Sequence, residues 1–383
     1  MRRARLAPEL AIALQEAGDN EEAIALANEA REVEDPIVRA RGIVAFAEAT
    51  AFRASDAVRA ERDAAREVLE QAEDDLGLAE YWRAAGFDHW SKVRTAEAME
   101  AWDRGLRHAG NAGAGWIEAE LEHLALSSVL FGPTPVPEAI ERVRHVLESV
   151  QGAALREAGA LRALGLLLAM REEIDEGRTL IERARSTWRE AGLATTAAGM
   201  AMTHAAVEQR AGELETQELI LREALGELER LRDRYFLPTV ALELAEALTA
   251  RAGREAEIEE LCAFARERTL PEDLVNFVYL DGIEGLLHAR RGQVDEAVPL
   301  ARRSIETVET MDHFDVVGTA RLLAAETFEL CGEHDEAAGL AKGAVSAFVA
   351  KGDVTGAAWA RARVREMGLA AADDSSAGPA NVA

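Results

Sequence analysis

The sequence predicts an all-α protein, a right-handed α-solenoid of about nine helical hairpins. Three observations support this: the residue usage, a repeat of about 40 residues, and the lack of strand-like runs. Hydrophobic residues make up 49% of the 383 positions although aromatic residues make up only 5%. Ala and Leu account for most of the hydrophobic residues, and together with Glu and Arg they favour helix. β-Branched and aromatic runs are too scarce for a β-sandwich or barrel.

A short unit recurs along the chain: Gly, two variable residues, an acidic pair, then Ala. It stands at Gly18–Ala23, Gly292–Ala297 and Gly332–Ala337, with weaker copies that begin at Glu172, Gly212 and Gly253. The starts at 172, 212, 253, 292 and 332 are 40, 41, 39 and 40 residues apart. A fixed period of this length indicates a helical repeat array.

Each unit reads as a helix, a tight turn and a second helix. The turn Gly accepts a left-handed backbone, and the acidic pair suits the positive end of the next helix. Small residues recur seven positions before the Gly (Ala11, Ala205, Gly285, Ala325) and twelve after it (Ala30, Ala224, Ser304, Ala344). This packing pattern is similar to that of tetratricopeptide (TPR) repeats. Trp82–Gly86, followed by Ala98 and Gly105, is the copy most similar to the TPR pattern.

The repeat register predicts where each hairpin lies. The predicted pairs are 6–17/20–33, 37–54/56–73, 75–92/95–109, 114–131/136–150, 154–171/174–191, 195–211/214–234, 237–252/254–269, 274–291/294–311 and 314–331/334–350, with a last helix at 354–367. No linker interrupts the array, so we expect one solenoid domain over residues 1–370. The polar tail 371–383 is expected to be disordered.

Charge and composition limit the kinds of partner that we expect for this protein. The 43 Lys and Arg against 70 Asp and Glu leave a formal charge of −27 without a basic stripe, so no direct nucleic-acid binding is expected. No apolar run approaches the ~18 residues of a membrane span, and no secretory leader follows Met1. We therefore expect a cytoplasmic protein that binds no membrane, with Cys262 and Cys331 as reduced thiols.

The chain lacks the usual sequence signatures of enzymes. A phosphate-binding loop needs Gly-Lys before Ser or Thr, and no Gly-Lys occurs. None of the eight histidines pairs with another at helical spacing. We therefore predict a protein that is not an enzyme, with no catalytic, cofactor-binding or metal-binding residues.

Three stretches carry a more specific resemblance: Leu130–Ala139, Gly77–Trp90 and Lys351–Arg361. Together with Leu6–Leu10 before the first turn, they resemble the C-terminal repeat region of actinobacterial proteins that combine an adenylate/guanylate cyclase domain with an AAA ATPase. The cyclase and ATPase domains have no counterpart in this sequence. The resemblance implies a regulatory or sensor module without the catalytic parts.

Two functions follow as expectations. The first is a non-catalytic scaffold that binds a protein or peptide in a groove lined by the first helices of the hairpins. The alternative is a regulatory module of a nucleotide cyclase/AAA ATPase or transcription-regulator system. The candidate groove residues are Arg83, Trp90, Arg162, Gln209, Arg210, Tyr279 and Arg290.

Arginine presents a planar fork that suits carboxylates, so the expected ligand is an acidic peptide or a free C-terminal carboxylate. The alternative is that these arginines pair with neighbouring glutamates of the chain itself. The sequence leaves the partner's identity and the oligomeric state open.

Overall fold

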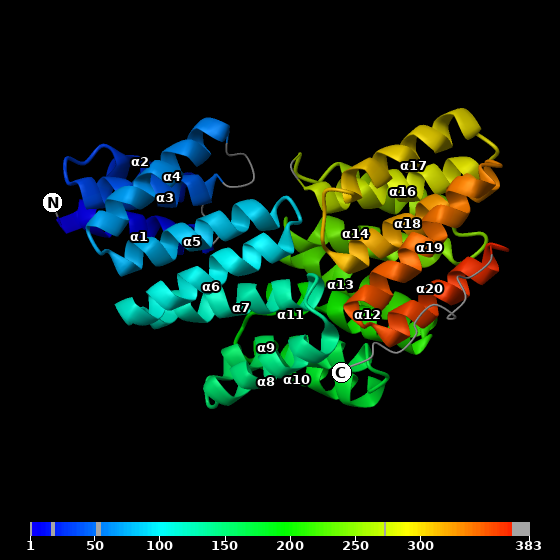
Figure 1. Cartoon of the computed structure of the whole chain (residues 1–383), viewed down its shortest axis with the longest axis horizontal. Helices are drawn as coiled ribbons and strands as arrows, with labels where there is room; N and C mark the ends of the chain where they lie inside the picture. Colours follow the sequence, from blue (N-terminus) through cyan, green and yellow to red (C-terminus); the bar gives the residue numbers. More distant parts are fainter. Residues whose placement is uncertain (1, 17–19, 51–54, 272, 370–383) are drawn as a thin grey trace, which may run out of the picture. The chain divides into compact units, whose positions relative to one another are not determined.

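The computed structural model describes residues 2–16, 20–50, 55–271 and 273–369, which contain α-helices and turns and no strand. The helices are α1 (Arg2–Glu16), α2 (Asn20–Arg31), α3 (Pro36–Ala49), α4 (Asp56–Gln71), α5 (Asp75–Trp90), α6 (Thr95–Ala112), α7 (Gly115–Phe131), α8 (Val136–Ser149), α9 (Ala154–Ala169), α10 (Ile174–Glu190), α11 (Ala194–Gly199), α12 (Ala201–Ala211), α13 (Leu214–Leu231), α14 (Phe236–Thr249), α15 (Glu255–Arg266), α16 (Leu274–Arg290), α17 (Val294–Val308), α18 (Phe314–Leu330), α19 (His334–Lys351) and α20 (Val354–Glu366). The predicted all-α fold of TPR-like hairpins is confirmed (Figure 1). Every helix in these ranges is too short or too polar to span a bilayer.

The chain packs as two compact units. Unit 1 contains the described residues up to Gly132 together with those of Leu270–Leu274, and unit 2 contains Pro133–Thr269 and the described residues from Val275 onward. Packing in two units does not measure whether they unfold together, so the single domain over residues 1–370 stays a prediction. The tail 371–383, predicted to be disordered, lies outside the described residues.

The turns follow the predicted register. Gly212, Gly292 and Gly332 have φ values of 77°, 73° and 85°, the left-handed backbone that lets a first helix end tightly. Glu172 stands at the same repeat position and also adopts a left-handed backbone, at φ 72°. Gly18, the first turn glycine of the pattern, lies outside the described residues.

Small residues occur where helices meet. The predicted small positions on first helices, such as Ala205 and Ala325, are buried, and so are Ala224 and Ser304 on second helices. The Ser304 hydroxyl donates a 3.0 Å hydrogen bond to the Val278 carbonyl across the helix contact. These positions are small because two backbones approach each other there.

One helix differs from the sequence prediction. The predicted helix 195–211 is split into α11 and α12 at Met200, which has ψ near −1°. An ideal Cβ on the preceding Gly199 would lie 2.5 Å from Cγ of the Phe236 ring. Glycine is a poor helix former, and here it gives the ring the space it needs. The aromatic contact comes from the next hairpin, so a repeat pattern could not reveal the break.

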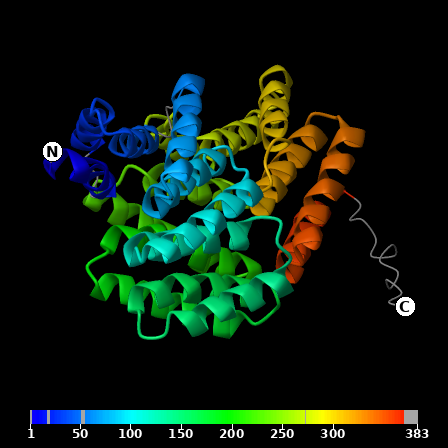
Figure 2. The ribbon, with the colours of Figure 1, turned by 60° about the vertical axis from the view of Figure 1, so that its left-hand side comes forward.

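The helices of the last hairpin lie side by side with α20, as the orange and red ribbons of Figure 2 show. Helix α20 also packs on α12 of the same unit. Unit 2 is therefore closed at its C-terminal end by a contact with a helix far earlier in the sequence.

We predict that Gly285→Leu destabilises the protein by about 1–3 kcal/mol, because overpacking at a helix contact forces neighbouring groups apart. An ideal Cβ at Gly285 already lies 3.3 Å from both the Ala297 carbonyl oxygen and the Ala301 nitrogen. The control is Gly339→Leu in α19, where a Cβ meets nothing within 4 Å. Urea denaturation should show the control unchanged or more stable. Equal midpoints for the two variants would contradict the assignment of Gly285 to a helix contact.

Candidate functional site

Two hydrogen bonds attach the start of α20 to the end of α9. The Val354 amide donates to the Met170 carbonyl at 2.9 Å, and the Thr355 hydroxyl donates to the Ala169 carbonyl at 2.9 Å. Residues 169 and 355 are 186 positions apart in sequence. The last carbonyls of a helix have no partner within the helix, and α20 supplies donors to two of those at the end of α9.

A buried ion pair fixes the same junction. Arg210 Nη2 and Nε donate to Asp353 Oδ2 at 2.7 and 3.0 Å, and Nη2 lies 3.4 Å from Asp315 Oδ1. The side chains of Arg210 and Asp353 are 1% and 0% exposed. Burial alone would lower the pKa of Arg210, but the two carboxylates outweigh it and raise that pKa above its usual value. Asp353 Oδ1 also accepts the Gly356 amide at 2.7 Å and so caps α20.

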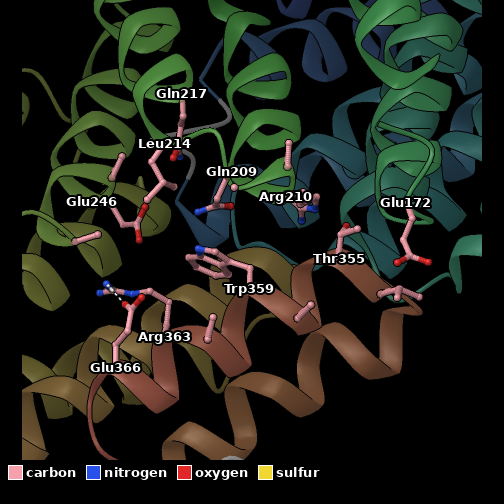
Figure 3. Close-up of a pocket in the computed structure, with 17 residues that line it drawn as sticks. Glu172, Gln209, Arg210, Leu214, Gln217, Glu246, Thr355, Trp359, Arg363 and Glu366 are labelled. Atoms are coloured by element: carbon pink, nitrogen blue, oxygen red, sulfur yellow. Dashed lines mark hydrogen bonds and ion pairs between the residues drawn. The ribbon is translucent and has the colours of Figure 1, made fainter. Parts of the chain in front are cut away.

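A cleft of about 530 Å³ lies beside this junction, within unit 2. Figure 3 shows Gln209, Gln217 and Glu246 on one side of the cleft and Trp359, Arg363 and Glu366 on the other. The first three belong to α12, α13 and α14, and the last three to α20. Its size falls in the range of small-molecule and peptide pockets.

The cations of the cleft are paired within the chain. Besides Arg210, the lining contains Arg363, which contacts Glu326 at 3.1 Å and Glu366 at 3.2 Å. Glu326 also accepts a 2.6 Å bond from Arg290. Each guanidinium at this site therefore already faces at least one carboxylate of the protein.

Several polar side chains at the cleft have no such partner in the part of the chain that the structure describes. The carboxylate of Glu246 makes no hydrogen bond or ion pair there, and neither do the side-chain amides of Gln209 and Gln217 or the indole N–H of Trp359. Gln217 is only 6% exposed. None of the four is among the buried polar atoms that lack a hydrogen bond, so their polar atoms reach the open space of the cleft, and these are the groups a ligand would engage.

Burial raises the pKa values of two acids beside the cleft. It raises the pKa of Glu246 to about 7; Arg363 opposes the shift, and Asp315 and Glu326 add to it. Burial also raises the pKa of Glu243 on the same helix to about 8, with Asp315 and Glu246 contributing. The pKa of Tyr279 is raised by burial and by the same acids.

The residues predicted from sequence fall into separate groups. Gln209 and Arg210 line the cleft. Arg290 lies outside the lining and donates to Glu326, the acid that also pairs with Arg363 of the lining. Tyr279 lies near the acids of α14 and α18. Arg162 is buried, with Nη1 3.0 Å from Met200 Sδ, and does not line the cleft.

The other two predicted residues belong to unit 1. Arg83 is buried between Glu48 and Glu120, with which it forms ion pairs. The Trp90 ring packs against Trp102, with centroids 5.7 Å apart. Arg83 therefore pairs with acids of the chain itself. The sequence leaves this pairing open as the alternative to ligand binding by the arginines. A role in binding for the seven residues stays a prediction.

Sequence reasoning missed Gln217, Glu246, Asp353, Trp359 and Arg363. Asp353 and Trp359 stand in the stretch that carried the family resemblance, and tryptophan is rare in this chain. Nothing in the spacing marked Glu246 among the 70 acids of the chain, or Gln217 among its glutamines. Only the packing of α20 on α12 brings the five into one place.

In the described part of the chain, neither a metal-binding cluster nor a reactive thiol adds to this cleft. Within the described residues, no three His, Cys, Asp or Glu side chains are grouped to hold a metal. Cys262 and Cys331 are free thiols, and burial raises the pKa of Cys262 to about 12. A thiol of that kind is a poor nucleophile at neutral pH.

No protein-family model and no curated protein matches the chain. Forty-two chains of solved structures match it. One is a Rap protein complexed with competence and sporulation factor, 13% identical over 96% of this chain and 98% of that chain, with a TM-score of 0.48. Another is the TPR domain of P58(IPK), 15% identical over 95% and 98%, with a TM-score of 0.24. These values assign the chain to no family, and the resemblance to cyclase/ATPase proteins is not confirmed.

We predict that Asp353→Asn destabilises unit 2 by about 3–5 kcal/mol, because it leaves the buried Arg210 with a poorer counter-charge. Asparagine still accepts the Gly356 amide, so the substitution separates the charge from the helix cap. The control is Glu215→Gln, which removes an exposed carboxylate paired with Arg251 and should change stability by at most about 1 kcal/mol. Chemical denaturation measures both. Similar small losses would show that the Arg210–Asp353 pair does not hold the junction.

We predict a pH effect from Glu243 and Glu246. Their folded pKa values lie above the ordinary 4.5, so the folded state binds these protons more tightly than the unfolded chain does. Their contribution favours folding at low pH and is lost as pH rises from 4.5 towards 8. The unfolding free energy of the wild type should therefore fall over this range relative to the Glu243→Gln/Glu246→Gln variant. Parallel pH profiles would contradict the burial of these carboxyls.

Proposed function

We propose that the protein is a non-catalytic helical-repeat scaffold that binds a protein or peptide segment in the cleft of unit 2. The observation that carries this proposal is the set of unpartnered polar side chains that meet there from α12, α13, α14 and α20. Peptide backbones present amide donors and carbonyl acceptors, which the Gln209 and Gln217 amides complement. The indole of Trp359 adds the kind of ring that often dominates binding energy.

A binding role also agrees with the way the cleft is built. Two of its walls, α12 and α20, are joined by the buried Arg210–Asp353 pair, and hydrogen bonds attach α20 to the end of α9. A site held on rigid elements loses little conformational freedom when a ligand arrives. The absence of a phosphate-binding sequence motif supports the non-catalytic part of the proposal.

The predicted preference for an acidic ligand fits the cleft poorly. A carboxylate entering it would have to compete with Asp353 for Arg210 or with Glu326 and Glu366 for Arg363. We therefore expect an acidic peptide to bind in this cleft less tightly than other peptides do.

A regulatory module of a cyclase/AAA ATPase system is the alternative, supported by the resemblance of residues 130–139 and 351–361. A cytoplasmic location belongs to both proposals. Co-purification of a cyclase or ATPase with the chain, and a change in its activity on addition of the chain, would favour the regulatory module.

We predict that a photo-crosslinker at Ala358, an exposed position that lines the cleft, captures a partner in the native cell. The matched control places the same group at the exposed Glu229 on α13, about 18 Å along the helix from Gln217. Mass spectrometry of the crosslinked products should give a partner enriched at Ala358 and absent at Glu229. Identical products at the two positions would refute binding in the cleft.

A further inference from the structure

The charge of the cleft is negative although two arginines line it. The lining carboxylates are Glu172, Glu246 and Glu366. Arg210 and Arg363 are neutralised in part by acids outside the lining, namely Asp315, Asp353 and Glu326. Carboxylates therefore outnumber guanidiniums in and around the cleft, which favours a cationic ligand.

Among the described residues, two lining acids, Glu172 and Glu246, have no counter-charge in contact, and of these Glu172 is exposed while Glu246 is partly buried. Glu246 lies on α14, and its carboxylate makes no ion pair or hydrogen bond among the described residues. Arg363, the cation that lowers the pKa of Glu246, is engaged by Glu326 and Glu366. A desolvated carboxylate of this kind gains more from an incoming cation than an exposed one does.

Gln217 provides an independent sign of a ligand. It is 94% buried, lines the cleft from α13, and its amide makes no hydrogen bond in the described part of the chain. Figure 3 shows its side chain directed into the cleft, towards the space above Trp359. The Gln217 amide atoms are not among the buried polar atoms that lack a partner, so they reach the cleft, where a ligand backbone would supply a donor and an acceptor.

Trp359 supplies an aromatic surface to the same space. Its ring contacts Phe348 edge-on, with centroids 5.9 Å apart and planes at 82°. Cations bind to the face of tryptophan more strongly than to other rings. A carboxylate on one wall and an indole on the other form a combination that recognises guanidinium and ammonium groups.

We infer that the cleft binds a peptide through a basic side chain, arginine or lysine, with Glu246 as its counter-charge, Trp359 as its aromatic surface and Gln217 as a partner for the ligand backbone. This inference rests on the proposed function. The cleft volume of about 530 Å³ accommodates one long side chain and the adjoining backbone.

The test uses the full chain and a library of heptapeptides whose central residue is Arg, Lys, citrulline or Glu, with Ala, Gly and Ser varied at the flanks. Peptides selected on an array are measured by fluorescence anisotropy at pH 8, where the Glu246 carboxylate is ionised. Citrulline keeps the shape of arginine without the charge. We expect Arg- or Lys-centred peptides to bind at least tenfold more tightly than their citrulline counterparts.

Variants locate the site. Glu246→Gln should weaken the binding of basic peptides at least fivefold and abolish the preference over citrulline. The matched control is Glu229→Gln, an exposed acid on α13 that should leave affinity unchanged. Trp359→Leu should weaken binding and Trp359→Phe should retain part of it. Because glutamine removes a desolvated carboxylate, Glu246→Gln is expected to fold, which circular dichroism and the melting temperature verify.

Each alternative outcome has a distinct meaning. Tight binding of citrulline- or Glu-centred peptides at the cleft would overturn the inference and leave the proposed function standing. Selective binding of basic peptides that Glu246→Gln does not change would overturn the assignment to this cleft. No binding by any peptide class would overturn both the inference and the proposed function.

Discussion

The buried ion pair between Arg210 and Asp353 joins two helices 143 positions apart in the chain. The two oxygens of Asp353 act separately, because Oδ2 receives the guanidinium while Oδ1 caps α20. A buried charge is tolerated only where a partner and hydrogen bonds replace water. The position of α20, and with it that of Trp359 and Arg363, therefore depends on this contact.

The same principle recurs between helices of neighbouring hairpins. In unit 1, Arg41 of α3 contacts Glu80 of α5 at 2.6 Å, and Glu80 is fully buried. In unit 2, Arg178 of α10 contacts the buried Glu208 of α12 at 2.6 Å. Arginine-to-carboxylate pairs thus fix one hairpin against the next, which accounts for much of the arginine in an acidic chain.

This use of arginine changes what the cleft can recognise. A guanidinium that holds two helices together is not available to a ligand without loss of the contact. The groups left over are those that no structural pair requires, such as the Glu246 carboxylate and the Gln217 amide. The recognition chemistry of the cleft is therefore set by the groups that remain after the helices are held together.

The sequence by itself determined the helices and their register. The 40-residue spacing of turn residues and small residues placed nearly every helix, because both features are local requirements of a tight helical hairpin. Even Glu172, without the usual glycine, adopts the left-handed turn that its position predicts. The split of one helix at Met200 is the exception, and its cause is a ring from the next hairpin.

Only the tertiary structure decided the site. The sequence pointed to Gln209 and Arg210 but left open whether Arg210 meets a ligand or an acid of the chain, since its acid partner lies 143 positions away and outside its repeat. Gln217, Glu246 and Trp359 had no distinguishing spacing, because periodicity reports contacts between adjacent repeats and not the closure of α20 onto α12. Which charges are paired and which remain open is a property of that closure, and it appears only when the chain is folded.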